Sequence, residues 1–300
     1  MTEKHFHSSG SYCRQVFGCK VYKLALSASV SCPNRDGTAG YGGCRFCSVG
    51  GSGDFAADVS KPLAEQLKEA KEILGAKGKN RSYIAYFQSF TGTYGNLNAL
   101  EKRYHQAANS EGIVGISVAT RPDCLGEREM QMLERLSEET TLWVELGLQT
   151  IHEKTAEAMN RCYPLSAYER AVEALRKLNV HIITHVILGL PSETREMMLE
   201  TVSYVGARSD GIKLQLLHVL RGTALAEDYA EGKFEVLGEE EYCALVADAL
   251  ERLPEKTVIH RMTGDGAKRD LIAPLWSGNK KEVLNRLNHT LRERGIYVGQ

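Results

Sequence analysis

The chain has 300 residues, a formal net charge of -1 and 43% hydrophobic residues, enough to bury a substantial core in one large domain or two ordinary ones. It has no run of eighteen apolar residues, and its start, "MTEKHFHSSG", lacks a signal-peptide core, so we expect neither a membrane span nor export. A cytoplasmic location follows, in which the eight cysteines stay reduced. The near-neutral charge gives no global attraction to nucleic acid.

Short apolar runs alternate with helical patterns along most of the chain. A capping box of Ser166 and Glu169 predicts the start of the helix before the fifth strand. After Val219 the rhythm loosens, with helices expected at Glu239–Leu253 and Lys280–Arg294 and a short strand at Thr257–Arg261. The six main strands are expected at Tyr22–Ser29, Tyr83–Gln88, Ile113–Val118, Leu142–Leu148, His181–Leu188 and Ile212–Val219.

Six βα units with nearly continuous apolar strands suggest a parallel sheet covered by helices. We therefore expect an α/β fold, a partial (βα)6 TIM-like barrel with a small C-terminal extension. Its core should span residues 21–220, after an N-terminal extension at 1–20, and residues 221–300 should pack on the barrel and close it. Functional residues should then lie at the carboxyl ends of the strands.

Three cysteines and seven glycines share the loop that follows the first strand, "SCPNRDGTAGYGGCRFCSVGGSGDF". Cys32, Cys44 and Cys47 have the spacing C-x11-C-x2-C. A [4Fe–4S] cluster held by only three thiolates would leave one iron open to a small molecule. The alternatives are free structural thiols, or a zinc site completed by a distant histidine.

With this loop, the chain resembles the radical S-adenosylmethionine (SAM) enzymes, although their commonest spacing is C-x3-C-x2-C. A smaller bacterial group is more similar, because its members carry "CPNRDG" before "GGC-x-FC", here Cys32–Gly37 and Gly42–Cys47. The second half also resembles the radical SAM domain of the Elongator catalytic subunit, at Thr120–Cys124, Val144–Thr150 and Asn160–Tyr163.

The resemblance implies that Cys32, Cys44 and Cys47 hold a [4Fe–4S] cluster, and that the amine and carboxylate of SAM chelate its open iron. An electron donor such as flavodoxin or ferredoxin is implied as well. Gln88 and Ser89 follow the second strand, where the family commonly has a glycine-rich acidic motif for the SAM amine. Their position alone assigns Gln88 and Ser89 to the SAM site, and the alternative is a polar turn without a ligand.

Glu145 interrupts an apolar strand, where an unpaired carboxylate would be costly to bury. Glu145, Gly147 and Gln149 alternate, so the three should face the same side. By resemblance, Glu145 bonds the ribose hydroxyls of SAM and Gln149 joins it in the cofactor site. The alternative for Glu145 is a structural ion pair, for example with Arg121.

Arg161 follows twelve residues after Gln149. By resemblance its guanidinium pairs with the SAM carboxylate, for which a planar fork is well suited. The alternative is a solvated surface arginine. We expect His181 and His185 to pack inside the barrel rather than to catalyse.

The Elongator resemblance further implies a transfer RNA substrate, and the C5 side chain of a wobble uridine in particular. Because the chain has no room for Elongator's acetyltransferase domain, we expect remodelling of an existing substituent, such as carboxymethylaminomethyl to aminomethyl. A protein or small-metabolite substrate, or a non-catalytic zinc-stabilised binding module, is the alternative. The basic residues that could contact RNA, unless they form only a solvated face, are Lys77, Lys79, Arg81, Lys280, Lys281, Arg286, Arg292 and Arg294.

Overall fold

The computed structural model describes residues 4–51, 56–75, 81–264, 266 and 268–299. Six consecutive strands form its centre and pair in parallel, each with the next along the chain. This confirms the α/β class and the six expected strands. They are β2 (Val21–Leu26), β3 (Ser82–Phe87), β4 (Ile113–Thr120), β5 (Thr141–Gln149), β6 (Val180–Leu188) and β7 (Gly211–Leu216).

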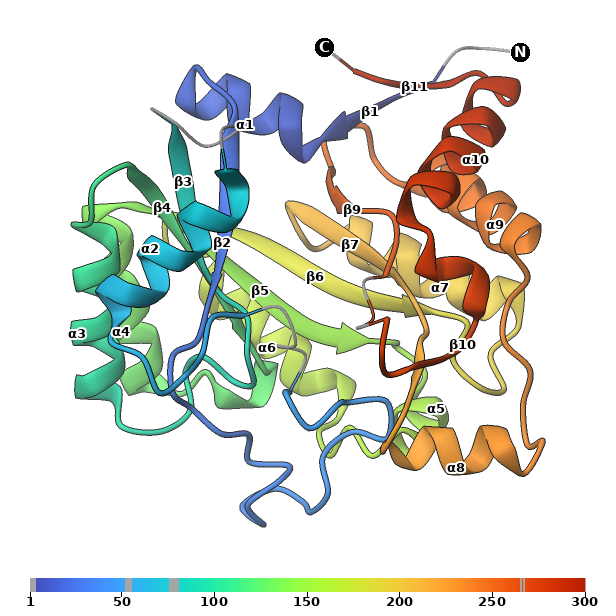
Figure 1. Ribbon diagram of the computed structural model, residues 1–300, viewed down its shortest axis with the longest axis horizontal. Helices are drawn as coiled ribbons and strands as arrows, with labels where there is room; N and C mark the ends of the chain where they lie inside the picture. The colour runs from blue at the N-terminus through green and yellow to red at the C-terminus, as the bar shows by residue number, and fades with distance from the viewer. Residues whose placement is uncertain (1–3, 52–55, 76–80, 265, 267, 300) are drawn as a thin grey trace.

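Helices connect these strands and cover the outside of the sheet (Figure 1). Each helix turns its apolar stripe inward, as α4 does with Met132, Leu133 and Leu136. The strands are apolar on both faces for the same reason. The connecting helices are α2 (Leu63–Leu74), α3 (Leu97–Ala108), α4 (Glu127–Glu139), α5 (Glu153–Ala158), α6 (Leu165–Leu175) and α7 (Arg195–Gly206), with a 3-10 turn at Pro122–Cys124.

Three further parallel strands continue the sheet past β7. The strand β9 (Val258–Arg261) pairs with β7, β1 (Lys4–Ser8) pairs with β9, and β11 (Ile296–Val298) pairs with β1. The two ends of the described chain therefore lie side by side (Figure 1). Within the described residues, β2 and β11 stand at opposite ends of the strand order, so these pairings leave the barrel open.

The remaining elements surround this sheet. The helix α9 (Glu239–Arg252) packs on α7, and α10 (Lys280–Glu293) packs on α9. Both helices begin where the sequence predicted. The others are α1 (Ser9–Phe17), α8 (Ala224–Ala230), the pair β8 (Val219–Leu220) and β10 (Leu271–Ala273), and a 3-10 turn at Leu275–Gly278. In the described part of the chain, no helix combines the length and apolarity needed to cross a membrane.

The predicted capping box at α6 is wrong. The helix begins at Leu165, directly after Pro164, and no side chain of its own caps it. Instead the Leu165 N–H donates to Glu153 Oε1 at 2.5 Å, so a carboxylate from α5 satisfies one of its free amides. Glu169 accepts a bond from the Tyr204 hydroxyl at 2.5 Å.

The apolar face of α10 generates a stability prediction. Leu287 is fully buried between α10 and the core, whereas Leu275 is 74% exposed. Leu287→Ala should lower the free energy of unfolding by about 2–5 kcal/mol. Leu275→Ala, the matched control, should change it by less than about 0.5 kcal/mol. Urea unfolding followed by circular dichroism measures both, and equal effects would contradict this packing.

Candidate functional site

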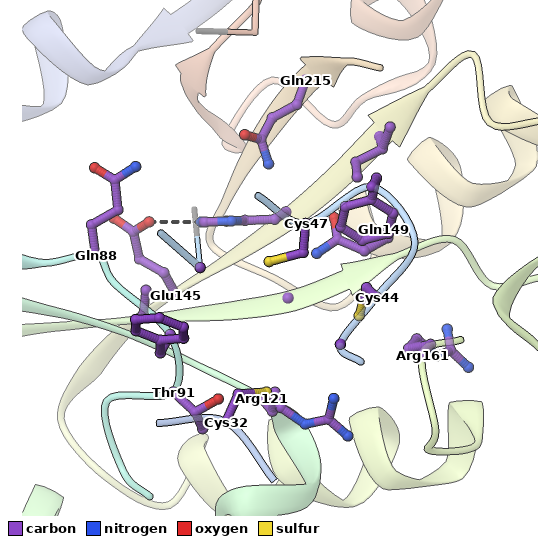
Figure 2. Close-up of a pocket in the computed structure, with 18 of the residues that line it drawn as sticks. Cys32, Cys44, Cys47, Gln88, Thr91, Arg121, Glu145, Gln149, Arg161 and Gln215 are labelled. Carbon is purple, nitrogen blue, oxygen red and sulfur yellow. Dashed lines mark hydrogen bonds and ion pairs between the residues drawn. The ribbon is translucent and has the colours of Figure 1, made fainter. Parts of the chain in front are cut away.

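A cavity lies at the carboxyl ends of the strands, bounded by the loop that follows β2. Cys32, Cys44 and Cys47 all line it (Figure 2). None of the three is in a disulfide. Within the described residues, no set of three or more His, Cys, Asp or Glu side chains could hold a single metal ion. An iron–sulfur cluster makes a different demand, because each thiolate binds a separate iron at its own corner. The thiol set around one cavity thus fits a cluster.

Two residues of the CPNRDG motif donate hydrogen bonds to the cysteine sulfurs. Asn34 Nδ2 lies 3.6 Å from Cys44 Sγ, and Arg35 Nη2 lies 3.4 Å from Cys47 Sγ. Sequence reasoning did not single out either residue, although both belong to the motif that begins at Cys32. Such N–H···S bonds stabilise negative charge on sulfur and tune a cluster's potential.

The thiol of Cys44 is in an environment that disfavours its charged form. Burial, and then the neighbouring Cys47, raise the pKa of Cys44 to about 12. Only a strong local positive charge would hold this sulfur as a thiolate at neutral pH, and bound iron supplies one.

Glycines let this loop pack closely against its surroundings. Gly51 has φ of +60°, and a Cβ there would lie 2.2 Å from the Phe90 ring. A Cβ on Gly40 would lie 2.3 Å from Asn34 Oδ1. Larger residues at either position would displace the loop from the segment after β3, or disturb the Asn34 side chain.

The segment after β3 brings Gln88 to the cavity but not Ser89. Gln88, Phe90 and Thr91 line it, whereas Ser89 is buried outside the lining. Phe90 has φ of +55°, so this segment turns and does not continue the strict alternation of the strand. Thr91 Oγ1 is buried without a hydrogen-bond partner among the described residues, as is Gln149 Oε1. Buried polar atoms normally have partners, so these two suit a polar ligand.

Glu145, Gly147 and Gln149 all line the cavity, as their alternation predicted. A Cβ on Gly147 would lie 3.2 Å from Gln149 Nε2, so the Gln149 side chain uses the room that this glycine leaves. Gln149 itself has φ of +72°, a left-handed conformation that is uncommon for a residue with a side chain. Such strain at the end of a strand is typical of functional sites.

Glu145 is fully buried and accepts four hydrogen bonds. Lys23 Nζ and Ser117 Oγ donate to Oε1 at 2.9 and 2.8 Å. His185 Nε2 donates to Oε2 at 2.7 Å, and Lys213 Nζ also bonds this oxygen. Four bonds fill the acceptor sites of a carboxylate. The geometry thus favours a charge-compensating role for Glu145 over the predicted bond to ribose.

The suggested ion pair between Glu145 and Arg121 is wrong. Arg121 forms a two-point pair with Asp123, through Nε to Oδ1 at 2.9 Å and Nη2 to Oδ2 at 2.7 Å. Asp123 is only two residues along the chain, in the turn after β4, and this places its carboxylate beside the guanidinium. Arg121 nevertheless lines the cavity.

The charges around Glu145 shift the pKa values of their neighbours. Burial alone would raise the pKa of Glu145, but Lys213, Lys23 and His185 outweigh it and hold the pKa well below its usual range. Burial, with the positive charges of Lys23 and Arg261, lowers the pKa of Lys213. Burial and then Lys213 lower the pKa of His185 to about 4, so its imidazole is neutral at pH 7.

Arg161 is buried, so the surface alternative is wrong. Its guanidinium donates to the carbonyls of Tyr163, Leu148 and Thr150, and to Glu153 Oε2 at 3.0 Å. These four bonds use four of the five N–H groups of an arginine. Among the described residues no partner takes the second Nη2 hydrogen, which could therefore donate one charged hydrogen bond to a ligand but could not form a two-point pair.

Several of the basic residues that could contact RNA bond other groups of the protein. Lys77 and Lys79 lie outside the described residues. Arg286 pairs with Glu239 and Glu240, and Arg294 pairs with Asp248 and Glu251. Arg81 bonds the Tyr22 hydroxyl. Much of this charge is therefore used within the protein.

The buried network makes a prediction for Glu145→Gln. This variant should lose roughly 3–5 kcal/mol of unfolding free energy at pH 7, because Lys213 is left buried without a counter-charge. Ser117→Ala, which removes one neutral donor, should cost only about 1 kcal/mol. Because the folded pKa of Glu145 is lowered, the wild-type advantage is complete above the unfolded pKa of about 4.3 and shrinks as the pH falls through the folded value. Urea unfolding across pH measures this, and a constant difference would contradict a charged Glu145.

Comparison with known proteins places these features in a family. Residues 30–205 match the model of the radical SAM superfamily, and residues 209–293 match the radical SAM C-terminal domain. The chain is 45% identical to YtqA of Bacillus subtilis, over 100% of this chain and 93% of that protein. It is 30% identical to Elongator complex protein 3 of Schizosaccharomyces pombe, over 58% of this chain but 32% of that protein.

A solved structure agrees on the fold. The archaeal Elp3 of Methanocaldococcus infernus superposes with a TM-score of 0.71, at 17% identity, over 92% of this chain and 63% of that chain. Together with the cysteine cavity, the family match over more than half of the chain is decisive. The chain belongs to the radical SAM superfamily, whose members use a [4Fe–4S] cluster and S-adenosylmethionine.

Proposed function

We propose that this radical SAM enzyme modifies the C5 side chain of a wobble uridine in transfer RNA. One observation supports this most directly. The three Elongator-like motifs come from separate strands and loops, yet Thr120, Glu145, Gln149 and Arg161 all line the cavity of the cysteines. The motifs that resemble Elongator therefore contribute side chains to the wall of this cavity.

The protein's own residues would bind and orient the cofactors. Cys32, Cys44 and Cys47 would hold the cluster, with Asn34 and Arg35 bonded to two of the sulfurs. Bound together, cluster and SAM supply a 5′-deoxyadenosyl radical that removes a hydrogen atom from the substrate. The groups that would bind polar atoms of SAM are Gln88, Thr91, Gln149 and the remaining N–H of Arg161.

The favoured substrate arm is carboxymethylaminomethyl. It holds a CH2 between an amine and a carboxylate, and both neighbours stabilise a radical at that carbon. After that hydrogen atom is removed, loss of one further electron to the oxidised cluster would give an imine, and its hydrolysis by water would release the two-carbon unit as glyoxylate and leave an aminomethyl group. A reduced flavodoxin or ferredoxin would deliver the electron that the cluster needs.

Nucleoside analysis of tRNA tests the substrate. Cells without the gene should accumulate carboxymethylaminomethyluridine and lose the aminomethyl product, as measured by mass spectrometry. Restoring the wild-type gene should reverse the change, whereas Cys44→Ala should not. Cys19→Ala, which alters a half-buried thiol outside the cavity, should restore it. An unchanged nucleoside profile in both aerobic and anaerobic cells would exclude this substrate.

The Arg35 contact predicts a shift in cluster potential. Arg35→Gln removes a charged N–H···S bond to Cys47, so the midpoint potential should fall, because the more negative reduced state loses stabilisation. Arg128→Gln, on the exposed face of α4, should leave the potential unchanged. A redox titration of reconstituted protein, followed by electron paramagnetic resonance, measures the shift, and iron content confirms loading. An unchanged or raised potential in Arg35→Gln would contradict the contact.

A further inference from the structure

The buried network fixes which nitrogen of His185 carries a hydrogen. Its positive neighbours hold the pKa of Glu145 well below its usual range, so this carboxylate is ionised and can only accept. His185 Nε2 therefore donates the 2.7 Å bond to Glu145 Oε2. Burial and then Lys213 lower the pKa of His185 to about 4, so the ring is neutral at pH 7. A neutral ring with hydrogen on Nε2 has a lone pair on Nδ1, which is thus a hydrogen-bond acceptor.

This acceptor is open to the cysteine cavity. The His185 ring lines the cavity, and 15% of its side chain is exposed. No described residue bonds its Nδ1. The atom is also not sealed in the protein, as the unpartnered Nδ1 of His260 is. A ligand in the cavity can therefore donate a hydrogen bond to His185 Nδ1.

Gln215 brings a second available polar group to the same wall. It lies two residues after Lys213 on β7, so both side chains face inward, and Figure 2 shows the Gln215 amide pointing into the cavity. The strand register places His185 beside Lys213, so Gln215 is one inward position further along the neighbouring strand. Within the part of the chain that the structure describes, no group bonds this amide. It can donate through Nε2 and accept through Oε1.

A fixed acceptor beside an adaptable amide fits the edge of a uracil base. Uracil presents an N3–H donor next to the O4 acceptor, whereas cytosine presents an N3 acceptor next to an N4 amino donor. The Gln215 amide can turn over to serve either base. His185 Nδ1 cannot become a donor while Nε2 is held by Glu145. An ammonium group could also donate to Nδ1, but the charge of Lys213 beside the ring disfavours a cation there.

The cavity has room for a base because it continues into a second cavity. The second cavity has a volume of about 480 Å³ and shares four wall residues with the first, Lys213 among them. His185 and Gln215 flank Lys213 and therefore lie at the border between the two cavities. Enzymes that act on a nucleobase take it out of its stack into a pocket and bind its Watson–Crick edge.

We infer that His185 Nδ1 accepts a hydrogen bond from uracil N3–H while Gln215 Nε2 donates to O4, so that this pair of residues selects uracil. The inference rests on the proposed function, in which the base is a wobble uridine. Glu145 is a positioning residue in this selection, because it holds the His185 ring in its accepting form. A bound cytosine would direct the lone pair of its N3 against that of Nδ1.

The test compares three anticodon stem-loop RNAs that lack a C5 arm, so that the result does not depend on the arm. They carry uridine, cytidine or N3-methyluridine at the wobble position. Dissociation constants are measured by fluorescence anisotropy on protein with reconstituted cluster and SAM, without a reductant. The wild type should bind the uridine RNA roughly tenfold or more tightly than either of the others, because each of those leaves Nδ1 without a donor.

Two variants separate the two residues. In His185→Gln the new amide can present a donor or an acceptor, so the uridine and cytidine RNAs should bind within about threefold of each other. In Gln215→Leu both RNAs should bind roughly tenfold more weakly with the preference for uridine intact, because the lost amide serves either base. Gln131→Leu, at an exposed position of α4, should match the wild type. Melting temperature and iron content show that each variant is folded and loaded.

The base preference can fail separately from the proposed reaction. Equal binding of the uridine and cytidine RNAs by the wild type, or an undiminished preference in His185→Gln, would overturn the inference. So would a Gln215→Leu protein that loses affinity for SAM but not for RNA, because its amide would then belong to the cofactor site.

The nucleosides of cells without the gene complete the comparison. A uridine preference that depends on His185, together with unchanged nucleosides in those cells, would support the base site and overturn the proposed reaction. Changed nucleosides without the preference would overturn the base site alone. Failure of the wild type to bind any of the three RNAs, with unchanged nucleosides, would overturn both.

Discussion

The Glu145 carboxylate is the interaction on which the arrangement of the barrel depends. It has direct partners on β2, β4, β6 and β7, and Lys213 extends the network to β3. One buried charge thereby links all six core strands. Apolar contacts between neighbouring strands are non-directional and persist when a strand shifts slightly. A buried carboxylate would lose hydrogen bonds after the same shift. The network thus ties the six strands together beside the cysteine cavity, which Tyr86, Glu145 and Lys213 also line. Its members, in strand order, are Lys23, Tyr86, Ser117, Glu145, His185 and Lys213.

The sequence predicted that Glu145 needs a partner or a cavity, and the structure has both. It could not identify the partners, because Lys23 and Lys213 lie 122 and 68 residues away. The order and register of the parallel strands bring these lysines to Glu145. The periodicity of each strand shows which residues point inward, but not which inward residues of different strands lie at the same level of the sheet. The predicted ion pair with Arg121 does not form, because Arg121 pairs with Asp123 in the turn that follows its own strand.

Local sequence patterns predicted the strands and helices well, because each short apolar run and each helical periodicity is a property of a few neighbouring residues. They failed at the start of α6, where a carboxylate from a neighbouring helix replaces the predicted cap. The residues that line the cavity show the same difference between regular strands and turns. Residues on a regular strand, such as Glu145, were placed correctly, but the turn after β3 was not, and Thr91 rather than Ser89 reaches the cavity. Asn34 and Arg35 were missed because nothing local distinguishes a sulfur-bonding side chain from a polar loop residue.

The pairing of β1 with β9 and β11 has a consequence for how the chain matures. These partners are separated by some of the longest sequence distances in the molecule, which makes their assembly slow. During synthesis, the cysteine loop leaves the ribosome while its sheet still lacks β7, β9 and the lysine on β7 that balances Glu145. The thiols are then accessible to oxygen before the surrounding barrel can shield them. Reducing conditions would therefore matter for this protein from the first hundred residues of translation onward.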